Sequence, residues 1–226
     1  MTWSPVKAAE PVSEEILSPL RIMEDPDGSA NVRSGPSVQG KVLGQLRTGT
    51  VVAIEPGPPR DWVKLWSDTD GGQARYVHSS RLRQVAKWKK IPGRVLKGEE
   101  AGMVRADGFE VQVKGVPFLV KDHRITKDKQ GQEWVDGKSP WGMDGGIPQV
   151  TLTWTVSLNG QRLKVPATAV DNLYQPNPDS LVLFTPGKAS DQAVVLMLNG
   201  DGAGGYCVAW AFKAGEYCGR EVFVPF

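Results

Sequence analysis

The chain has 226 residues and a formal net charge of +2 at neutral pH. This length fits one large domain or two small ones, and the whole-molecule charge favours no particular partner. The 26 glycines and 17 prolines exceed average usage, yet aromatic residues are plentiful, which excludes a disordered chain and indicates short strands joined by tight turns. No stretch has the length of a membrane span, and no signal-peptide core follows Met1. The composition predicts an all-β protein.

Short strands separated by turn signals fill residues 20–85. Strands are predicted at 31–33, before a Gly-Pro turn, and then at 41–46, 51–54, 62–65 and 76–77. A short turn at 78–81 leads to a last strand. The proline-rich stretch at 56–59 cannot lie inside a central strand, because proline lacks the N–H donor.

The order and spacing of these segments resemble the bacterial SH3 (SH3b) domain. The resemblance is carried by Asn-Val-Arg-Ser-Gly-Pro-Ser from residue 31, Lys-Val-Leu-Gly from 41, Trp-Val-Lys-Leu from 62 and Tyr-Val-His-Ser-Ser-Arg-Leu from 76. It implies a small, strongly bent barrel, in secreted or periplasmic proteins and often beside cell-wall enzymes. Asp61 and Arg75 precede the two late aromatics, Trp62 and Tyr76, where the family commonly has glycine. These departures lie in the ligand-facing loops, so the resemblance alone does not imply that this chain binds peptidoglycan.

A basic run follows this module. Such a run suits an anionic polymer, whether cell-wall phosphate or nucleic acid, but it also suits a solvated linker and a strand edge protected from pairing. We interpret it as the solvated segment and expect no nucleic-acid partner. Between residues 71 and 98 there is no acidic residue, and eight are basic: Arg75, Arg81, Arg83, Lys87, Lys89, Lys90, Arg94 and Lys97.

Residues 87–226 contain further hairpin patterns and predict an antiparallel β-sandwich. A turn at Lys114-Gly115 would pair apolar residues across 109–120, and Asn159-Gly160 would join two strands within 150–165. A third hairpin spans 206–224, and further strands are predicted at 181–184 and 194–198. This pattern places Trp154 and Trp210 in the core. We expect a flexible leader at 1–19, the SH3b domain at 20–86 and the sandwich at 87–226, which faintly resembles an uncharacterised bacterial β domain.

Three loop tracts, at 139–148, 171–177 and 199–206, carry the acids Asp144, Asp171 and Asp201. Two acids across a cleft would suffice for a glycosidase, whereas aspartate in Gly- and Asn-rich tracts more often makes turns. The calcium-like pattern around Asp201 lacks the later bidentate glutamate. Trp141 and Tyr206 beside these acids could stack on sugars or peptides, or fill the core.

The cysteines and histidines do not form a recognisable catalytic or zinc set. His78 and His123 are too few for a zinc site, and Cys207 follows a Gly-rich loop and not a helix start that would activate it. A disulfide between Cys207 and Cys218 is open. A two-residue turn at 214–215 would hold the two cysteines several rows apart, whereas a longer loop would bring them together.

These patterns favour a non-enzymatic extracytoplasmic binding or scaffolding protein, periplasmic or secreted, without cofactor, metal or membrane span. Its partner would be cell-wall peptidoglycan or an envelope protein. The alternative is a cell-envelope polysaccharide hydrolase or lyase that uses Asp144, Asp171 or Asp201, so enzymatic activity stays uncertain. The candidate binding residues are Trp62, Tyr76, Trp141, Asp144, Asp201 and Tyr206.

Overall fold

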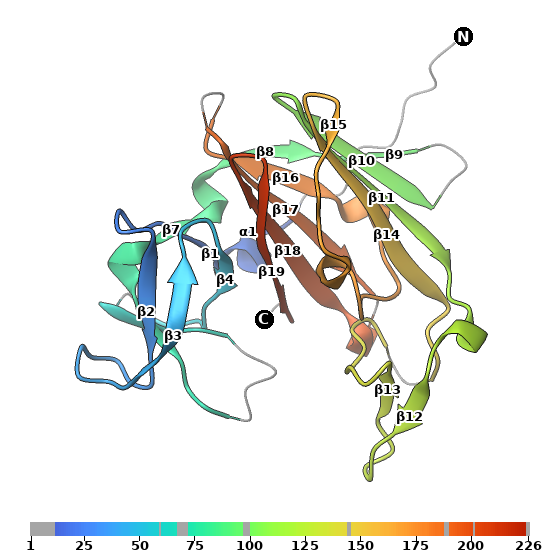
Figure 1. The fold of residues 1–226 in the computed structure, drawn as a ribbon, viewed down its shortest axis with the longest axis horizontal. Coiled ribbons are helices and arrows are strands. Elements are labelled where there is room, and N and C mark those ends of the chain that lie inside the picture. Colours follow the sequence, from blue (N-terminus) through green and yellow to red (C-terminus); the bar gives the residue numbers. More distant parts are fainter. Residues whose placement is uncertain are drawn as a thin grey trace. The chain divides into compact units, whose positions relative to one another are not determined.

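The computed structural model describes residues 12–58, 60–66, 72–96, 100–143, 146–187, 190–200 and 202–224. Strands dominate this part of the chain, and its one α-helix is α1 (Glu14–Leu17), which Ser13 caps (Figure 1). The predicted all-β class is therefore confirmed. Within the described residues, no helix has the length and apolar character needed to span a membrane.

The described residues divide into two compact units, each built from separate stretches of sequence. The N-terminal unit comprises residues 12–89, 184–195 and 209–224. The central unit comprises residues 90–183 and 196–208.

The N-terminal unit holds two antiparallel sheets over one core. Leu20–Met23 (β1) lies between Val51–Ala53 (β4) and Leu82–Gln84 (β7), and the second sheet has the order β3-β2-β6-β5. The core under these sheets is formed by Met23, Val32, Val52, Ile54, Leu65, Val77 and Leu82. The strands predicted between residues 31 and 77 are confirmed to within one or two residues: β2 (Ser29–Arg33), β3 (Val42–Arg47), β4, β5 (Trp62–Lys64) and β6 (Tyr76–His78).

The C-terminal hairpin belongs to this unit from Ala209 onward. Tyr206–Lys213 (β18) and Glu216–Phe223 (β19) are joined at Ala214 and Gly215, whose φ values of 50° and 77° are those of a two-residue turn. The predicted turn is confirmed, and β19 packs against β4. Cys207 and Cys218 are both free thiols, so this structure has no disulfide between them.

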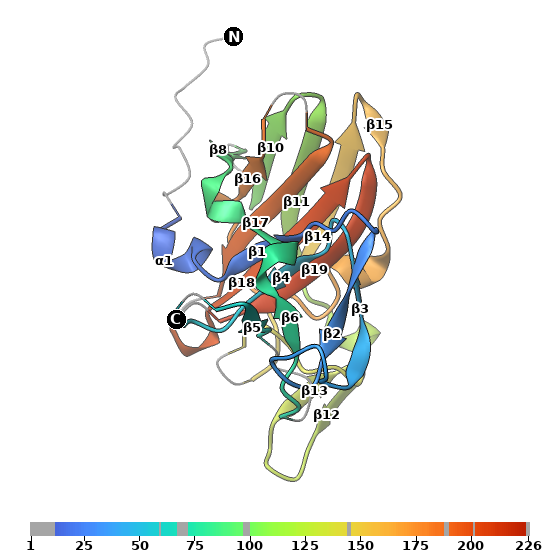
Figure 2. The ribbon, with the colours of Figure 1, turned by 90° about the vertical axis from the view of Figure 1, so that its left-hand side faces the viewer.

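The central unit is built on a five-stranded antiparallel sheet of order β15-β14-β11-β10-β9, whose strands are all labelled in Figure 1 and, apart from β9, also in Figure 2. Its strands are Arg94–Val95 (β9), Ala101–Ala106 (β10), Phe109–Pro117 (β11), Val150–Leu158 (β14) and Gln161–Arg162 (β15). The predicted turn at Asn159-Gly160 is confirmed, with φ values of 51° and 78°. A separate hairpin joins Ile125–Lys127 (β12) to Glu133–Val135 (β13).

The predicted turn at Lys114-Gly115 is wrong. Residues 109–117 form one continuous strand in which Gly115 pairs with Leu152 of β14. A Cβ at Gly115 would lie 2.9 Å from a methyl carbon of Val150, so this glycine permits close packing and does not reverse the chain.

Another five-stranded sheet has the order β19-β18-β17-β16-β8. It includes Lys89–Pro92 (β8), Val182–Thr185 (β16) and Gln192–Asn199 (β17), so the strands predicted at 181–184 and 194–198 are present. Trp210 of β18 is fully buried, as predicted, whereas Trp154 of β14 is only half-buried.

Candidate functional site

A groove of about 690 Å³ lies on the N-terminal unit. Its walls come from the loop after β4, from β5 and β6, and from the 3-10 turn η1 (Ser79–Arg81) with the start of β7. Trp62 and Tyr76, the two aromatics singled out from the sequence, both line it.

Strand register explains why these aromatics meet. Trp62 pairs with His78 and Lys64 pairs with Tyr76, while Val63 and Val77 form the pair between them. Because side chains alternate along a strand, Trp62, Lys64, Tyr76 and His78 project to one side and the valines to the other. The rings of Trp62 and His78 make an edge-to-face contact, with centroids 5.3 Å apart.

Proline residues form part of the groove lining. Pro36, Pro56 and Pro58 line the groove, and the buried side chains of Ile54 and Leu82 contribute to its lining. Proline rings offer apolar surface without an N–H group that would need a partner, and aromatic-lined grooves of this kind bind extended chains. The groove can therefore hold a narrow, extended ligand.

The charged side chains of the groove are mainly positive. Arg21, Arg60 and Lys64 line it together with one carboxylate, Glu55. Lys64 Nζ lies 2.5 Å from Glu55 Oε1, and this hydrogen bond raises the pKa of Lys64. Arg21 Nη1 donates to the carbonyl oxygen of Leu20 at 2.9 Å, and burial lowers the pKa of its guanidinium, which stays charged at neutral pH. The excess of cations favours an anionic or hydroxyl-rich ligand.

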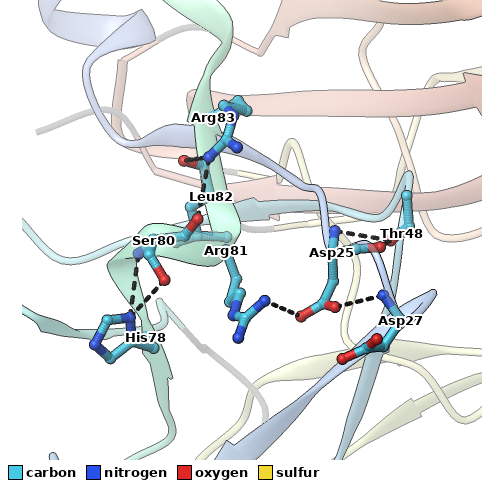
Figure 3. Close-up of polar contacts among 8 residues, drawn as sticks. All are labelled: Asp25, Asp27, Thr48, His78, Ser80, Arg81, Leu82 and Arg83. Carbon is cyan, nitrogen blue, oxygen red and sulfur yellow. Dashed lines mark hydrogen bonds and ion pairs between the residues drawn. The ribbon is translucent and has the colours of Figure 1, made fainter.

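The turn after β6 holds one end of the groove in place (Figure 3). His78 Nδ1 lies 2.7 Å from Ser80 Oγ and accepts from the backbone N–H of Ser80 at 3.3 Å, so His78 caps the turn. The N–H of Ser79 donates to the carbonyl of Asp61 at 2.7 Å, which ties the turn to the start of β5. These bonds fix Ser79 where it lines the groove.

An ion pair with a buried carboxylate links the same turn to the segment after β1 (Figure 3). Arg81 Nη1 lies 3.1 Å from Asp25 Oδ2, and Asp25 is only 7% exposed. The other oxygen of Asp25 accepts from the N–H of Asp27 at 2.8 Å, and the Asp25 backbone bonds with Thr48 Oγ1. Arg83 lies 3.0 Å from Glu24. Part of the basic run at 71–98 is thus neutralised within the unit.

The other predicted aromatics lie in the central unit. The backbone N–H of Trp141 donates to the carbonyl of Asn172 at 2.9 Å, and its ring lies 5.9 Å from that of Tyr206. Tyr206 is 2% exposed, and its hydroxyl donates to the carbonyl of Tyr174 at 2.9 Å. Tyr206 therefore supports the loops from inside.

Of the three loop acids, only Asp171 falls within the described residues, and it is paired with Lys138. Asp144 and Asp201 lie outside them, so the distances between the three carboxylates are not defined. Burial raises the pKa of Cys207 to about 12, which keeps this thiol protonated at neutral pH. In the part of the chain that the structure describes, no three His, Cys, Asp or Glu side chains gather as a metal site would require.

Residues 28–83 match the family model of the bacterial SH3 domain. This segment is a bacterial SH3 domain. The match spans β2 to the middle of β7 and includes Trp62 and Tyr76, whereas Arg21 precedes it and the C-terminal part of the chain is unassigned. SH3 domains of this type are typically cell-wall-binding modules of envelope or secreted bacterial proteins. Searches of curated proteins and of solved structures found no match to the chain.

Sequence reasoning missed the cations of the groove. Arg21 lies in a strand before the SH3 motifs, and Lys64 became a groove residue only through its register with Tyr76. The proline-rich loop was visible in the sequence, but it gave no indication of what it faces.

Proposed function

We propose that this protein is a non-enzymatic binding protein of the bacterial cell envelope, periplasmic or secreted, whose SH3 domain holds an extended segment of peptidoglycan. The single observation that carries this proposal is the groove that joins Trp62 and Tyr76 to a proline wall and three cations. It lies almost wholly within the segment that matches a family of typical wall-binding modules.

The chemistry of the groove suits the peptide stems of the wall. The faces of Trp62 and Tyr76 can pack on aliphatic parts of the stem, while Arg21 and Arg60 can bind its carboxylates. Lys64 is held by Glu55 and is half-exposed, so an incoming carboxylate would compete with Glu55 for it.

The test is co-sedimentation of the full chain with insoluble peptidoglycan. We expect retention at low salt that falls as salt rises, because exposed charges are screened. Trp62→Ala should lower retention about tenfold or more, since a central aromatic anchor contributes most of the binding energy of such sites. Lys64→Gln should weaken retention less and reduce its salt dependence.

The matched control is Lys129→Gln, which removes an equal charge from an exposed site in the central unit. This variant should sediment like the wild type, and a thermal melt should show that all variants are folded. Absence of wild-type retention at low salt would overturn wall binding and turn attention to an envelope protein as partner. Equal retention of Trp62→Ala and wild type would overturn the groove as the site.

A further inference from the structure

The outward face of the sheet β15-β14-β11-β10-β9 carries polar side chains. On β14, Leu152 and Val156 are buried while Thr153 and Thr155 between them are exposed. Gln112 pairs with Thr155 and Lys114 pairs with Thr153, so the four side chains form two adjacent rows on one face. Sequence alternation therefore builds a flat surface of hydroxyl, amide and ammonium groups.

Two cavities share lining residues with this face. One of about 370 Å³ lies over β11 and β14 and is lined by these four residues and by Arg162. The other, of about 390 Å³, lies between β14 and residues 162–165. Trp154, Thr155 and Arg162 line both cavities, so the two are neighbours, and we call them together the sheet groove. Each is within the range of about 300–1,000 Å³ that is typical of small-ligand sites.

The end of β15 creates the second cavity. Ser157 pairs with Arg162, and the N–H of Leu163 donates to the carbonyl of Val156 at 2.8 Å. The strand β15, labelled in Figures 1 and 2, ends at Arg162. Beyond it, Leu163, Lys164 and Val165 line the second cavity together with Trp154. Trp154 was expected in the core, but its half-buried side chain borders the groove instead.

The charge of the sheet groove is entirely positive. Its lining residues include Lys114, Arg162 and Lys164 and no aspartate or glutamate. The nearby Glu110 on the same face is bound by Arg105, with Nε 2.6 Å from Oε2, and accepts at Oε1 from the side-chain amide of Gln112 at 2.9 Å, which leaves the amide oxygen and second N–H of Gln112 for a ligand. Arg162 and Lys164 are exposed and have no ion pair with any described residue.

We propose that the sheet groove binds an acidic polysaccharide, a glycan strand whose sugars carry carboxylates. Arg162 and Lys164 provide charge-assisted hydrogen bonds to carboxylates, and a guanidinium can bind a carboxylate through two parallel bonds. Thr155 and Gln112 provide the hydroxyl and amide groups that exchange hydrogen bonds with sugar hydroxyls. From β10 to β15 the face spans three strand spacings, about 14 Å, which suits an extended chain more than a single small anion.

Calorimetric titration of the full chain with oligogalacturonate at low salt tests this inference. We expect binding of this carboxylated glycan, weaker binding of polyphosphate and none of neutral dextran. Arg162→Gln combined with Lys164→Gln should weaken oligogalacturonate binding at least about tenfold, the effect of losing a charge-assisted hydrogen bond. Lys121→Gln combined with Lys129→Gln removes the same charge from other exposed sites of the central unit and should leave the affinity unchanged.

Four outcomes would overturn the proposal. The first is no binding of oligogalacturonate at low salt, and the second is an equal loss of affinity in the two double variants. The third is dextran binding as tight as oligogalacturonate binding. The fourth is polyphosphate binding at least as tight as oligogalacturonate binding, which would indicate a general polyanion surface. Trp62→Ala should retain oligogalacturonate binding, so this site and the proposed wall-binding groove can fail independently.

Discussion

At the scale of single residues, Asp25 is a buried carboxylate that holds the turn η1 beside the SH3 groove. It is 7% exposed, pairs with Arg81 and accepts from the N–H of Asp27. We expect Asp25→Ala to lower the free energy of unfolding by about 2–3 kcal/mol, because the guanidinium and an N–H lose a desolvated partner. Urea denaturation of the full chain measures this loss.

The matched control is Glu24→Ala, which removes the neighbouring carboxylate and its pair with Arg83. Both side chains of that pair are about half-exposed, so the loss should stay below about 1 kcal/mol. Equal losses from the two substitutions would contradict the assignment of Asp25 as the buried anchor.

The residues of the SH3 groove differ in how visible they are in the sequence. Trp62 and Tyr76 stand inside the motifs that carry the SH3 resemblance, so their shared position follows from the family pattern. Arg21 and Glu55 reach the same groove from other segments of the chain, and only the folded register brings them there. A pairing interaction at long sequence separation has no local signature.

At the scale of elements, glycine shows why hairpin prediction succeeded twice and failed once. At Asn159-Gly160 and Ala214-Gly215 both residues have positive φ, which is what a two-residue hairpin turn demands. Gly115 lies in an extended strand paired with β14, and the position is glycine because a larger residue would clash with Val150. The local pattern around Gly115 is equally compatible with a turn, and only the neighbouring strand β14 decides between them.

The hairpin β12–β13 should be sensitive to acid. The side-chain hydrogen bond from His123 and the bond from the N–H of Arg124 lower the pKa of Asp136. Desolvation alone would raise the pKa of Asp128, but donors led by the N–H of Gln132 outweigh it, and the pKa falls. Both carboxylates therefore favour the folded hairpin above the ordinary carboxyl pKa of about 4, and this contribution is lost as pH falls through their lower folded values.

Amide hydrogen exchange or NMR shifts of Thr126 and Trp134, followed from pH 5 to pH 2, measure this transition. As the pH falls, the protection of amide hydrogens from exchange should decrease in the hairpin before it decreases in β11 and β14. The backbone hydrogen bonds of those two strands involve no carboxylate. Asp136→Asn should lower hairpin protection already at pH 5 and flatten its pH dependence. Hairpin protection that is independent of pH in the wild type would contradict the role of these aspartates.

At the scale of the whole molecule, the N-terminal unit is assembled from both ends of the sequence. Its SH3 segment contacts the C-terminal strand β19 through β4, and residues 184–195 belong to the same unit. The division of the chain at residues 86 and 87 treats the SH3 domain as self-contained and stays a prediction. The β4–β19 contact indicates that the domain gains stability from the C-terminal hairpin.

Two glycines with similar positive φ values isolate this contribution. Gly28 and Gly49 have φ values of 82° and 94°, so an alanine at either is strained by about 1 kcal/mol. A Cβ at Gly28 would meet nothing within 4 Å, whereas at Gly49 it would lie 3.0 Å from Cys218 Sγ. We expect Gly49→Ala to lower the unfolding free energy by about 1 kcal/mol more than Gly28→Ala does. Combining Gly49→Ala with Cys218→Ala should recover that difference, because the clashing sulfur is removed. If denaturation gives Gly28→Ala and Gly49→Ala equal losses of unfolding free energy, β19 does not closely contact the β3–β4 turn in solution.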